Sequence, residues 1–265
     1  MLKISGVNKV FNAGTVNEKI ALRNVNLDVK RGEFITVIGS NGAGKSTMMN
    51  MISGGMLPDE GTITIDGKNV TKLGEHQRAS LIGRVFQDPM AGTAPNMTIE
   101  ENLAIALARG QGRKLSFGVN NHKRELFREQ LKQLDQGLEN RLKTKVGFLS
   151  GGQRQALSLL MATFTEPKIL LLDEHTAALD PKRAQLIVDL TEKIVERFSL
   201  TTIMVTHNME QALNMGNRLL MLHDGGIILD IPDEKKRTMK PQDLLRAFET
   251  ARGGESFNED RFLLT

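Results

Sequence analysis

The chain has 265 residues, a formal net charge of +4 and no cysteine. The lack of cysteine excludes disulfides, thiolate metal sites and a cysteine nucleophile, while the length allows a full α/β core. Basic and acidic residues are interleaved, and neither Trp nor Tyr is present, so we expect a solvated mixed surface and no nucleic-acid partner.

The sequence has no uninterrupted apolar run of the roughly 18 residues that suggest a membrane-spanning helix. Its first residues, MLKISGVNKVF, lack the basic, apolar and small-residue segments of a secretory signal. We therefore expect a cytoplasmic protein that does not itself cross a membrane.

Strands are the first elements predicted along the chain. Apolar side chains nearly alternate over residues 22–29, residues 30–33 form a turn, and residues 34–38 are apolar at almost every position. Two similar apolar runs follow at 169–172 and 202–205. Such runs are typical of strands covered on both faces, in a parallel or mixed sheet flanked by helices.

The clearest predicted helix covers residues 181–198, where apolar residues recur with a period near 3.6. Asp180 is a good N-cap because its side chain accepts unpaired backbone N–H groups, and Pro181 suits the first helical position. The alternation of buried strands with helices predicts an α/β core.

The pattern changes after residue 88, where no strand of this apolar kind appears before residue 148. Helices are predicted at 99–109 and 123–142, on either side of a Gly-containing loop at 110–121. We interpret this region as a helical subdomain, at about 88–159, inserted into the core.

A glycine-rich motif follows the strand at 34–38 and fits the pattern G-x-x-x-x-G-K-[ST]. Its backbone N–H groups and the N-terminus of the next helix would bind phosphates. Lys45 would reach the β- and γ-phosphates, and Ser46 would ligate Mg²⁺. A turn used only for packing would not need the Lys-Ser-Thr at its end. The residues expected to contact the nucleotide are Gly39, Ser40, Asn41, Gly42, Ala43, Gly44, Lys45, Ser46 and Thr47.

Two carboxylates, Asp173 and Glu174, directly follow the apolar run at 169–172. The carboxyl ends of parallel strands are where ligands bind in open α/β sheets. Asp173 could hold the shell of a Mg²⁺ ion through water, and Glu174 could polarise the attacking water as a general base. Alone, an Asp-Glu pair after a strand could equally be a helix cap; together with the phosphate loop it favours nucleotide hydrolysis.

A third motif distinguishes among phosphate-loop hydrolases, which include transporters, helicases and GTPases. Residues 149–153 read LSGGQ, and here the sequence resembles the ABC ATPase family. Ser150 and the following N–H groups would cap a helix and form a second anion site. The resemblance implies a head-to-tail homodimer in which this motif contacts the ATP bound to the partner subunit. The residues concerned are Ser150, Gly151, Gly152 and Gln153.

Further positions match the same family. Gln87, in VFQDP, matches a glutamine directed at Mg²⁺ and the attacking water, and His207, in VTH, matches the histidine that contacts the γ-phosphate. The resemblance thus implies catalytic roles for Glu174, His207, Gln87 and Lys45. It implies metal contacts for Ser46, Gln87 and Asp173.

Weaker matches have ordinary structural alternatives. Phe11 stands where the family places an adenine-stacking aromatic, although a Phe is more often a packing residue. The run 178–180 resembles a loop that crosses the dimer interface, but Asp180 is already explained as a helix cap. His76, His122 and His223 match nothing in the family, and we expect them on the surface.

The resemblance covers about residues 1–231 and implies a P-loop ABC-type α/β fold. That fold has a RecA-like mixed sheet, an antiparallel β subdomain and the helical insertion. Residues 232–265 form a highly charged tail in which we predict a short helix at 241–250. No function is assigned to this tail.

The function implied is that of an ATP-hydrolysing subunit powering solute uptake through separate integral membrane permease subunits. An extracytoplasmic solute-binding protein would be an indirect partner, and the chain would sit on the inner face of the cell membrane. The stretch DPMAGTAPNM and the run DEHTAALD suggest a bacterial uptake system, with aromatic amino acids as the suggested cargo. The alternative is a soluble ABC ATPase without transport, such as an iron–sulfur cluster assembly subunit.

Overall fold

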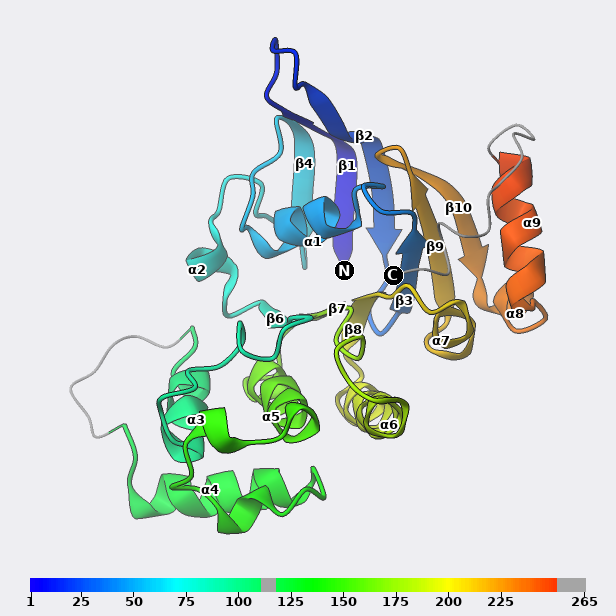
Figure 1. The fold of residues 1–265 in the computed structure, drawn as a ribbon. Helices are drawn as coiled ribbons and strands as arrows, with labels where there is room; N and C mark the ends of the chain where they lie inside the picture. The colour runs from blue at the N-terminus through cyan, green and yellow to red at the C-terminus, as the bar shows by residue number, and fades with distance from the viewer. Residues whose placement is uncertain (111–117, 252–265) are drawn as a thin grey trace. The chain divides into compact units, whose positions relative to one another are not determined.

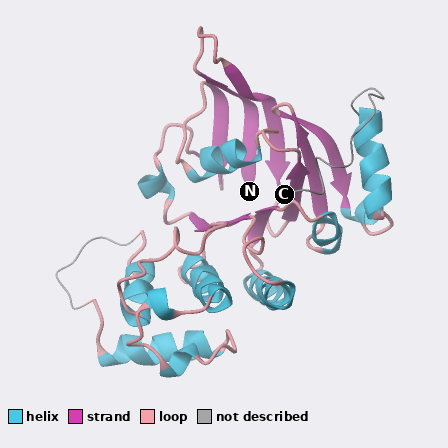
Figure 2. Cartoon of the chain, in the orientation of Figure 1, coloured by secondary structure: helices cyan, strands magenta, loops and turns pink. Residues whose placement is uncertain are grey.

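The structure is a computed structural model that describes residues 1–110 and 118–251. The chain divides into two compact units. The first unit comprises Met1–Arg78 and Thr201–Thr265, and the second comprises Ala79–Leu200. Strands dominate the first unit and helices the second (Figures 1 and 2). Within the described ranges, no helix is long and apolar enough to span a membrane.

The first unit contains an antiparallel sheet in the order β2-β1-β4-β5. In β2, buried residues alternate with exposed ones over most of the strand, as the apolar pattern predicts. The strands are β1 (Leu2–Phe11), β2 (Lys19–Val29), β4 (Glu60–Ile65) and β5 (Lys68–Asn69).

The strand that leads to the phosphate loop, β3 (Phe34–Gly39), lies between two parallel neighbours. These are β8 (Thr201–Val205) and β9 (Arg218–His223), and β10 (Gly226–Pro232) pairs antiparallel with β9. Every residue of β3 and β8 is buried. The two apolar runs at 34–38 and 202–205 are therefore covered strands, as predicted.

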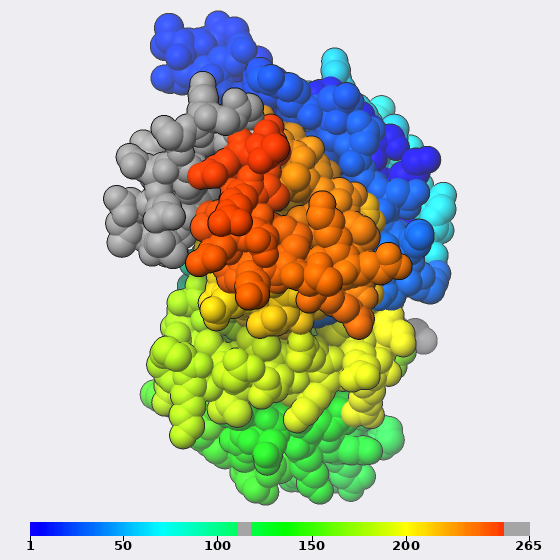
Figure 3. Space-filling view, turned by 90° about the vertical axis from the view of Figure 1, so that its right-hand side faces the viewer, coloured from blue at the N-terminus to red at the C-terminus, as the bar shows by residue number. Residues whose placement is uncertain are grey.

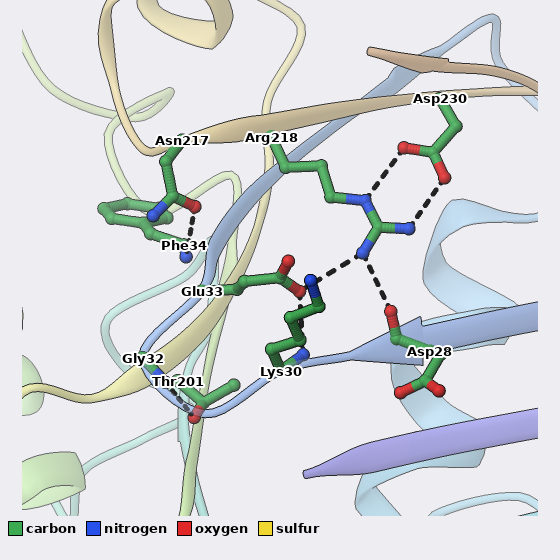
Figure 4. Close-up of polar contacts among 9 residues, drawn as sticks. All are labelled: Asp28, Lys30, Gly32, Glu33, Phe34, Thr201, Asn217, Arg218 and Asp230. Atoms are coloured by element: carbon green, nitrogen blue, oxygen red, sulfur yellow. Dashed lines mark hydrogen bonds and ion pairs between the residues drawn. The ribbon is translucent and has the colours of Figure 1, made fainter. Parts of the chain in front are cut away.

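Arg218 fixes the entry to β3 (Figure 4). Its Nε and Nη2 donate to the two carboxylate oxygens of Asp230, at 2.8 and 2.7 Å. Its Nη1 donates to the Asp28 carbonyl at 2.8 Å and to Glu33 Oε2 at 3.2 Å. Bidentate arginine–carboxylate pairs are among the stronger and more directional polar contacts. The guanidinium thus joins β9 and β10 to the turn between β2 and β3.

Short helices complete the first unit. Helix α9 lies against β10 (Figure 3). Its Leu244 and Phe248 join a buried cluster that includes Ile38 of β3. The predicted helix at 241–250 is therefore present. The helices of the first unit are α1 (Lys45–Ser53), α2 (Glu75–Arg78), α7 (Met209–Asn214), α8 (Asp233–Lys236) and α9 (Pro241–Ala251).

One lysine and one histidine of this unit are buried or nearly buried, although the sequence around them suggests a solvated charged surface. Lys236 of α8 is 1% exposed, and its Nζ donates to the carbonyls of Met215 and Gly216. His223, expected on the surface, has a side chain that is only 17% exposed and packs edge-on against Phe248. Packing of α8 and α9 against β9 and β10 covers both side chains.

The second unit joins a parallel strand pair to a group of helices. Strand β6 (Ile82–Val85) pairs with β7 (Ile169–Asp173), and α5 contacts β6, α3, α4 and α6. Its longer helices are α3 (Ile99–Leu107), α4 (Asn121–Lys132), α5 (Gly151–Thr163) and α6 (Pro181–Phe198). Helix α6 begins at Pro181, and the Asp180 side chain accepts from the Arg183 N–H as an N-cap.

The predicted helix at 123–142 is wrong in its second half. Helix α4 ends at Lys132, and the chain continues through the 3₁₀ turns η1 (Leu138–Asn140) and η2 (Val146–Phe148). Asp135 and Gly137 have φ values of +51° and +68°, which an α-helix cannot contain. The helix predicted at 99–109 ends two residues early, at Leu107. Most of the predicted loop at 110–121 lies outside the described residues.

Candidate functional site

The phosphate-loop motif connects β3 to α1 in the first unit. Lys45 begins α1 and is 6% exposed. Its Nζ donates to the carbonyls of Gly39 and Ser40 at 2.6 and 3.1 Å, so the ammonium is held inside its own loop. Ser46, the next residue, is exposed. A cation and a hydroxyl therefore lie together at the N-terminus of a helix, an arrangement suited to binding phosphate.

Two glycines in this loop are required by the backbone path. A Cβ at Gly39 would lie 2.3 Å from the Leu222 carbonyl oxygen. Gly44 has a φ of +102°, and a Cβ there would lie 2.5 Å from the Ala21 carbonyl oxygen. Both distances are impossible without a backbone shift, so β2 and β9 leave room only for glycine at these positions.

The first unit also holds Phe11 and His207. Phe11 ends β1 and is partly exposed, with Lys9 Nζ 6.0 Å from the centre of its ring, so it is not a core residue. His207 is partly exposed between β8 and α7. The turn around it is ordered by Thr206, whose hydroxyl donates to Gln211 Oε1 at 2.7 Å and accepts from the Asn208 N–H at 3.1 Å.

In the second unit, Asp173 is the last residue of β7, and it makes an ion pair that the sequence did not reveal. Arg84 of β6 donates from Nη2 to Asp173 Oδ2 at 2.9 Å, and the two side chains are 13% and 16% exposed. The parallel register sets Arg84 opposite Leu171, two residues before Asp173. Finding this pair from sequence would have required that register.

Glu174, the predicted general base, has an unusual backbone conformation. Its φ is +46°, in the left-handed region that residues other than glycine rarely adopt. The chain turns there, and the Glu174 carbonyl accepts from the Ala177 N–H at 3.0 Å. Such backbone strain costs about 1–3 kcal/mol and persists only where the surroundings hold it in place.

His175, which follows, holds this turn to α6. Its ring is buried, and its Nε2 lies 3.1 Å from Thr191 Oγ1. The Thr191 hydroxyl donates to the Ile187 carbonyl, so Nε2–H of His175 is the donor to Thr191. Burial lowers the pKa of His175 to about 4, and the imidazole is therefore neutral near pH 7.

Gln87 lies two residues after the end of β6 and is exposed, so its side chain can contact a ligand. The chain then turns at Asp88, whose Oδ1 accepts from the Met90 N–H at 2.8 Å. The preceding carbonyl, that of Phe86, accepts from Nε2 of the buried Gln155 at 3.3 Å. Helix α5 thus fixes the backbone immediately before Gln87.

The LSGGQ motif forms the N-terminus of α5, as predicted. Ser150 is the N-cap, and its Oγ accepts from the Gln153 N–H at 3.3 Å. The Gln153 side chain returns the bond, because its Oε1 accepts from the Ser150 N–H at 3.2 Å. This reciprocal capping box is visible in the sequence as Ser-x-x-Gln, but it was not identified there. A Cβ on buried Gly152 would meet Arg183 of α6 at 3.4 Å.

The two units therefore hold different parts of the predicted site. The first unit brings together the phosphate loop at 39–47 and also contains Phe11 and His207. The second unit brings Asp173 and Glu174 together and also contains Gln87 and the motif at 149–153. No group of three or more His, Cys, Asp or Glu residues in the described parts of the chain could hold a metal.

Comparison with known sequences places these motifs in one family. The family model described as ABC transporter matches residues 22–177. The tyrosine transport ATP-binding protein of Clostridioides difficile strain R20291 is 44% identical over 251 residues, covering 95% of this chain and 100% of that protein. The glycine betaine/carnitine/choline transport ATP-binding protein OpuCA of Bacillus subtilis strain 168 is 35% identical, covering 88% of this chain and 58% of that protein.

Solved structures agree with this assignment. The ATP-binding cassette MJ0796, in a dimeric post-hydrolysis state bound to ADP and Pi, is 32% identical with a TM-score of 0.75. The match covers 88% of this chain and 99% of that one. The ADP conformation of MJ1267, an ATP-binding cassette of an ABC transporter, is 26% identical with a TM-score of 0.75 over 94% of this chain. The mixed α/β fold, the phosphate loop and the sequence matches agree: this chain is an ATPase of the ABC transporter family.

Proposed function

We propose that the chain hydrolyses ATP as one half of a homodimer and thereby powers solute uptake through separate permease subunits. The observation that carries this is the phosphate loop, in which Lys45 is held against the Gly39 and Ser40 carbonyls beside the exposed Ser46. Successive backbone N–H groups in a glycine-rich loop of this kind can form an anion-binding concavity for phosphate. Lys45 and the residues at 39–47 would bind the nucleotide, and Phe11 would stack on adenine.

The proposed general base, Glu174, lies in the second unit. Glu174 would accept a proton from the attacking water, while Gln87 and, from the first unit, His207 would orient that water and the γ-phosphate. The motif at 150–153 would contact the nucleotide bound to the other copy through the capped N-terminus of α5. The domain boundaries are part of this proposal: a nucleotide-binding domain at 1–231, a helical subdomain inserted at about 88–159, and a charged tail at 232–265.

The donor set fits Mg²⁺ as the metal cofactor. Ser46, Gln87 and Asp173 offer hydroxyl, amide and carboxylate oxygens, which are the hard ligands that Mg²⁺ prefers. Mg²⁺ usually keeps several waters and takes further ligands from substrate phosphates, so that few protein ligands are needed. When bound, Mg²⁺ would neutralise charge on the phosphates.

We further propose an aromatic amino acid as the cargo. The relative from Clostridioides difficile, described as a tyrosine transport protein, supports this because the chain covers all of it. The partners would be integral membrane permease subunits, an extracytoplasmic solute-binding protein and a second copy of this chain. The protein would then be peripheral on the inner face of the membrane. The soluble iron–sulfur assembly alternative has no comparable support.

Nucleotide binding and hydrolysis by the purified full chain test the enzymatic part. Lys45→Ala should abolish measurable ATP binding or turnover, because the loop loses its only lysine. Lys182→Ala, which removes an exposed lysine from α6, serves as the control and should leave both unchanged. Normal ATPase activity in Lys45→Ala would contradict the phosphate-loop assignment.

Uptake assays test the cargo separately. Cells lacking this chain should lose uptake of labelled tyrosine while retaining uptake of glycine betaine. The unsubstituted chain should restore tyrosine uptake, and Glu174→Gln should not. Unchanged tyrosine uptake in the deletion strain would reject the cargo but leave the ATPase assignment intact. Recovery of the chain only in soluble complexes, never with detergent-extracted membranes, would reject its docking on a permease.

A further inference from the structure

The ion pair between Arg84 and Asp173 is a contact to the proposed metal-binding carboxylate from outside the recognised motifs. Arg84 Nη2 lies 2.9 Å from Asp173 Oδ2, and both side chains are at least four-fifths buried. A charge-assisted hydrogen bond in such a partly dry setting is stronger and more directional than one in water. It therefore restrains the rotation of the carboxylate at the end of β7.

The same guanidinium also contacts the segment that leads to Gln87. Arg84 lies over the Phe86 ring, with its guanidinium carbon 4.7 Å from the ring centre. A cation at this distance is attracted to the ring face. The Phe86 carbonyl in turn accepts from Gln155, which is completely buried on α5. Arg84 is thus in contact, directly or through Phe86, with β7, the segment before Gln87 and the helix that begins at the LSGGQ motif.

We propose that Arg84 is a positioning residue for Mg²⁺ binding. By occupying Oδ2 it orients the carboxylate of Asp173, and by stacking on Phe86 it keeps that orientation coupled to the position of Gln87. The proposal rests on the assignment of Asp173 to the metal shell in the proposed function. A merely structural ion pair would affect folding stability, whereas a positioning residue also sets how strongly Mg²⁺ improves nucleotide binding.

Two substitutions separate the contributions of Arg84. Arg84→Met keeps the length and apolar character of the side chain but removes the charge, and Arg84→Lys keeps the charge without the planar fork. The probe is an N-methylanthraniloyl derivative of ADP, which is not hydrolysed, titrated onto the full chain with and without Mg²⁺. Its fluorescence gives the nucleotide affinity in each condition.

In Arg84→Met, the affinity for the ADP derivative without metal should stay within about twofold of that of the unsubstituted chain. The improvement of this affinity by Mg²⁺ should fall by about tenfold, because removal of a group that supports a metal ligand usually costs at least that much. The Mg²⁺ concentration for half-maximal ATPase activity should rise in parallel. Arg84→Lys should recover part of the effect. An unchanged or lower Mg²⁺ requirement in Arg84→Met would overturn the proposal, because the arginine would then be neutral to the metal or compete with it.

Control variants test whether the change in Mg²⁺ dependence arises from the loss of any ion pair or from impaired folding. Arg124→Met breaks the Arg124–Glu100 pair of the same unit, which joins α4 to α3, and should leave the Mg²⁺ dependence unchanged. Phe86→Leu removes only the aromatic face under Arg84 and should show a smaller shift in the same direction. It supplies the test if Arg84→Met does not fold, and an unshifted Phe86→Leu would then reject the coupling to Gln87.

Failure of this proposal can be distinguished from failure of the proposed function. If Mg²⁺ does not improve nucleotide binding in the unsubstituted chain, the metal assignment of Asp173 is wrong, and the role of Arg84 is lost with it. If the unsubstituted chain responds to Mg²⁺ and Arg84→Met responds equally, only the role of Arg84 is wrong. If the improvement of nucleotide binding by Mg²⁺ falls equally in Arg84→Met and Arg124→Met, the Arg84–Asp173 pair only stabilises the unit in general.

Discussion

The two units present their functional residues by different physical means. In the first unit, the phosphate loop depends on backbone geometry, since Gly39 and Gly44 lie where a Cβ would collide with neighbouring carbonyls. In the second unit, the functional residues depend on side-chain contacts. Arg84 holds Asp173, and His175 holds the turn at Glu174 to α6.

This difference predicts different sensitivities to mutation. A site built from backbone is damaged when a methyl group is added, because the chain has no alternative path. A site held by side chains is damaged when a contact is removed, because a strained or charged group then loses its restraint. Substitutions that add a Cβ and substitutions that remove a side-chain contact therefore separate these two kinds of dependence.

The largest effect on turnover with binding retained should come from Glu174→Gln, which removes the proposed general base of the second unit. Nucleotide affinity should be retained, while kcat should fall by about 10³-fold because the general base is lost. Phosphate release and nucleotide titration measure the two quantities. Glu196→Gln, at an exposed position on α6, should have neither effect.

The same variant tests the dimer. With ATP and Mg²⁺, Glu174→Gln should elute from size exclusion as a dimer, since the nucleotide that closes the interface is not consumed. Elution as a monomer under these conditions would contradict the head-to-tail arrangement. An ATPase rate within tenfold of the unsubstituted chain would show that Glu174 is not the base.

Gly44→Ala should show the backbone dependence of the first unit. The added Cβ would lie 2.5 Å from the Ala21 carbonyl oxygen at a φ of +102°. If relief of this collision distorts the loop by about 3 kcal/mol, ATP affinity should fall by about 100-fold. Gly67 also has a positive φ, +79°, but a Cβ there would meet nothing within 4 Å. Gly67→Ala should therefore cost about 1 kcal/mol of stability and leave ATP affinity unchanged.

The buried His175 should make the stability of the chain fall in acid. Its pKa is about 4 in the folded chain, below the ordinary value of 6.5, so between these values only the unfolded chain takes up a proton. The folded state should lose about 2 kcal/mol from this group between pH 7 and pH 5, and nothing above pH 7. Denaturant melts at both pH values should show a smaller pH dependence in His175→Gln. His122→Gln, on an exposed helix position, should retain the dependence of the unsubstituted chain.

The smallest effect is expected from substituting either of two helix caps within the second unit. Ser150 caps α5 and Thr98 caps α3, each in a reciprocal capping box. Substitution of either by Ala should cost about 1 kcal/mol of stability. Only Ser150→Ala should also lower the ATPase rate, because Ser150 alone is proposed to contact nucleotide. Equal ATPase rates in the two variants would leave Ser150 as a structural cap.

The sequence was most informative where local chemistry decides the structure. The buried runs of β3, β7 and β8 need only a continuous apolar stretch, and the start of α6 needs only Asp180 and Pro181. The phosphate loop could be placed because its glycines and Lys45 are contiguous. In each case the interactions that fix the conformation lie within a few residues of one another.

The prediction failed where a pattern continued past the element that produced it. Phe127, Leu131, Leu134, Leu138 and Leu142 keep a helical spacing and are all buried, although α4 ends at Lys132. The chain keeps these side chains inward through turns with left-handed Asp135 and Gly137. Hydrophobic spacing reports which side chains are buried, and here two different backbone paths satisfy it.

Contacts between residues far apart in the sequence could not be predicted, for a different reason. The Arg84–Asp173 pair joins residues 89 positions apart and depends on the β6–β7 register. The burial of Lys236 was hidden by the charged sequence around it, because its position depends on how α8 packs against β9 and β10. No local propensity encodes either contact.

The position of β3 also bears on the order in which the chain can fold during synthesis. The strand is made early, but its partners β8 and β9 begin at residues 201 and 218. At about 5–20 residues per second, the ribosome needs roughly 8–30 seconds to supply the first of them. The strand before the phosphate loop must wait for that time without its neighbours, whereas β6 and β7 have both been synthesised before either partner of β3 exists. The strand that leads to the nucleotide-binding loop therefore gains its sheet partners only after the unit that holds the proposed general base has been made.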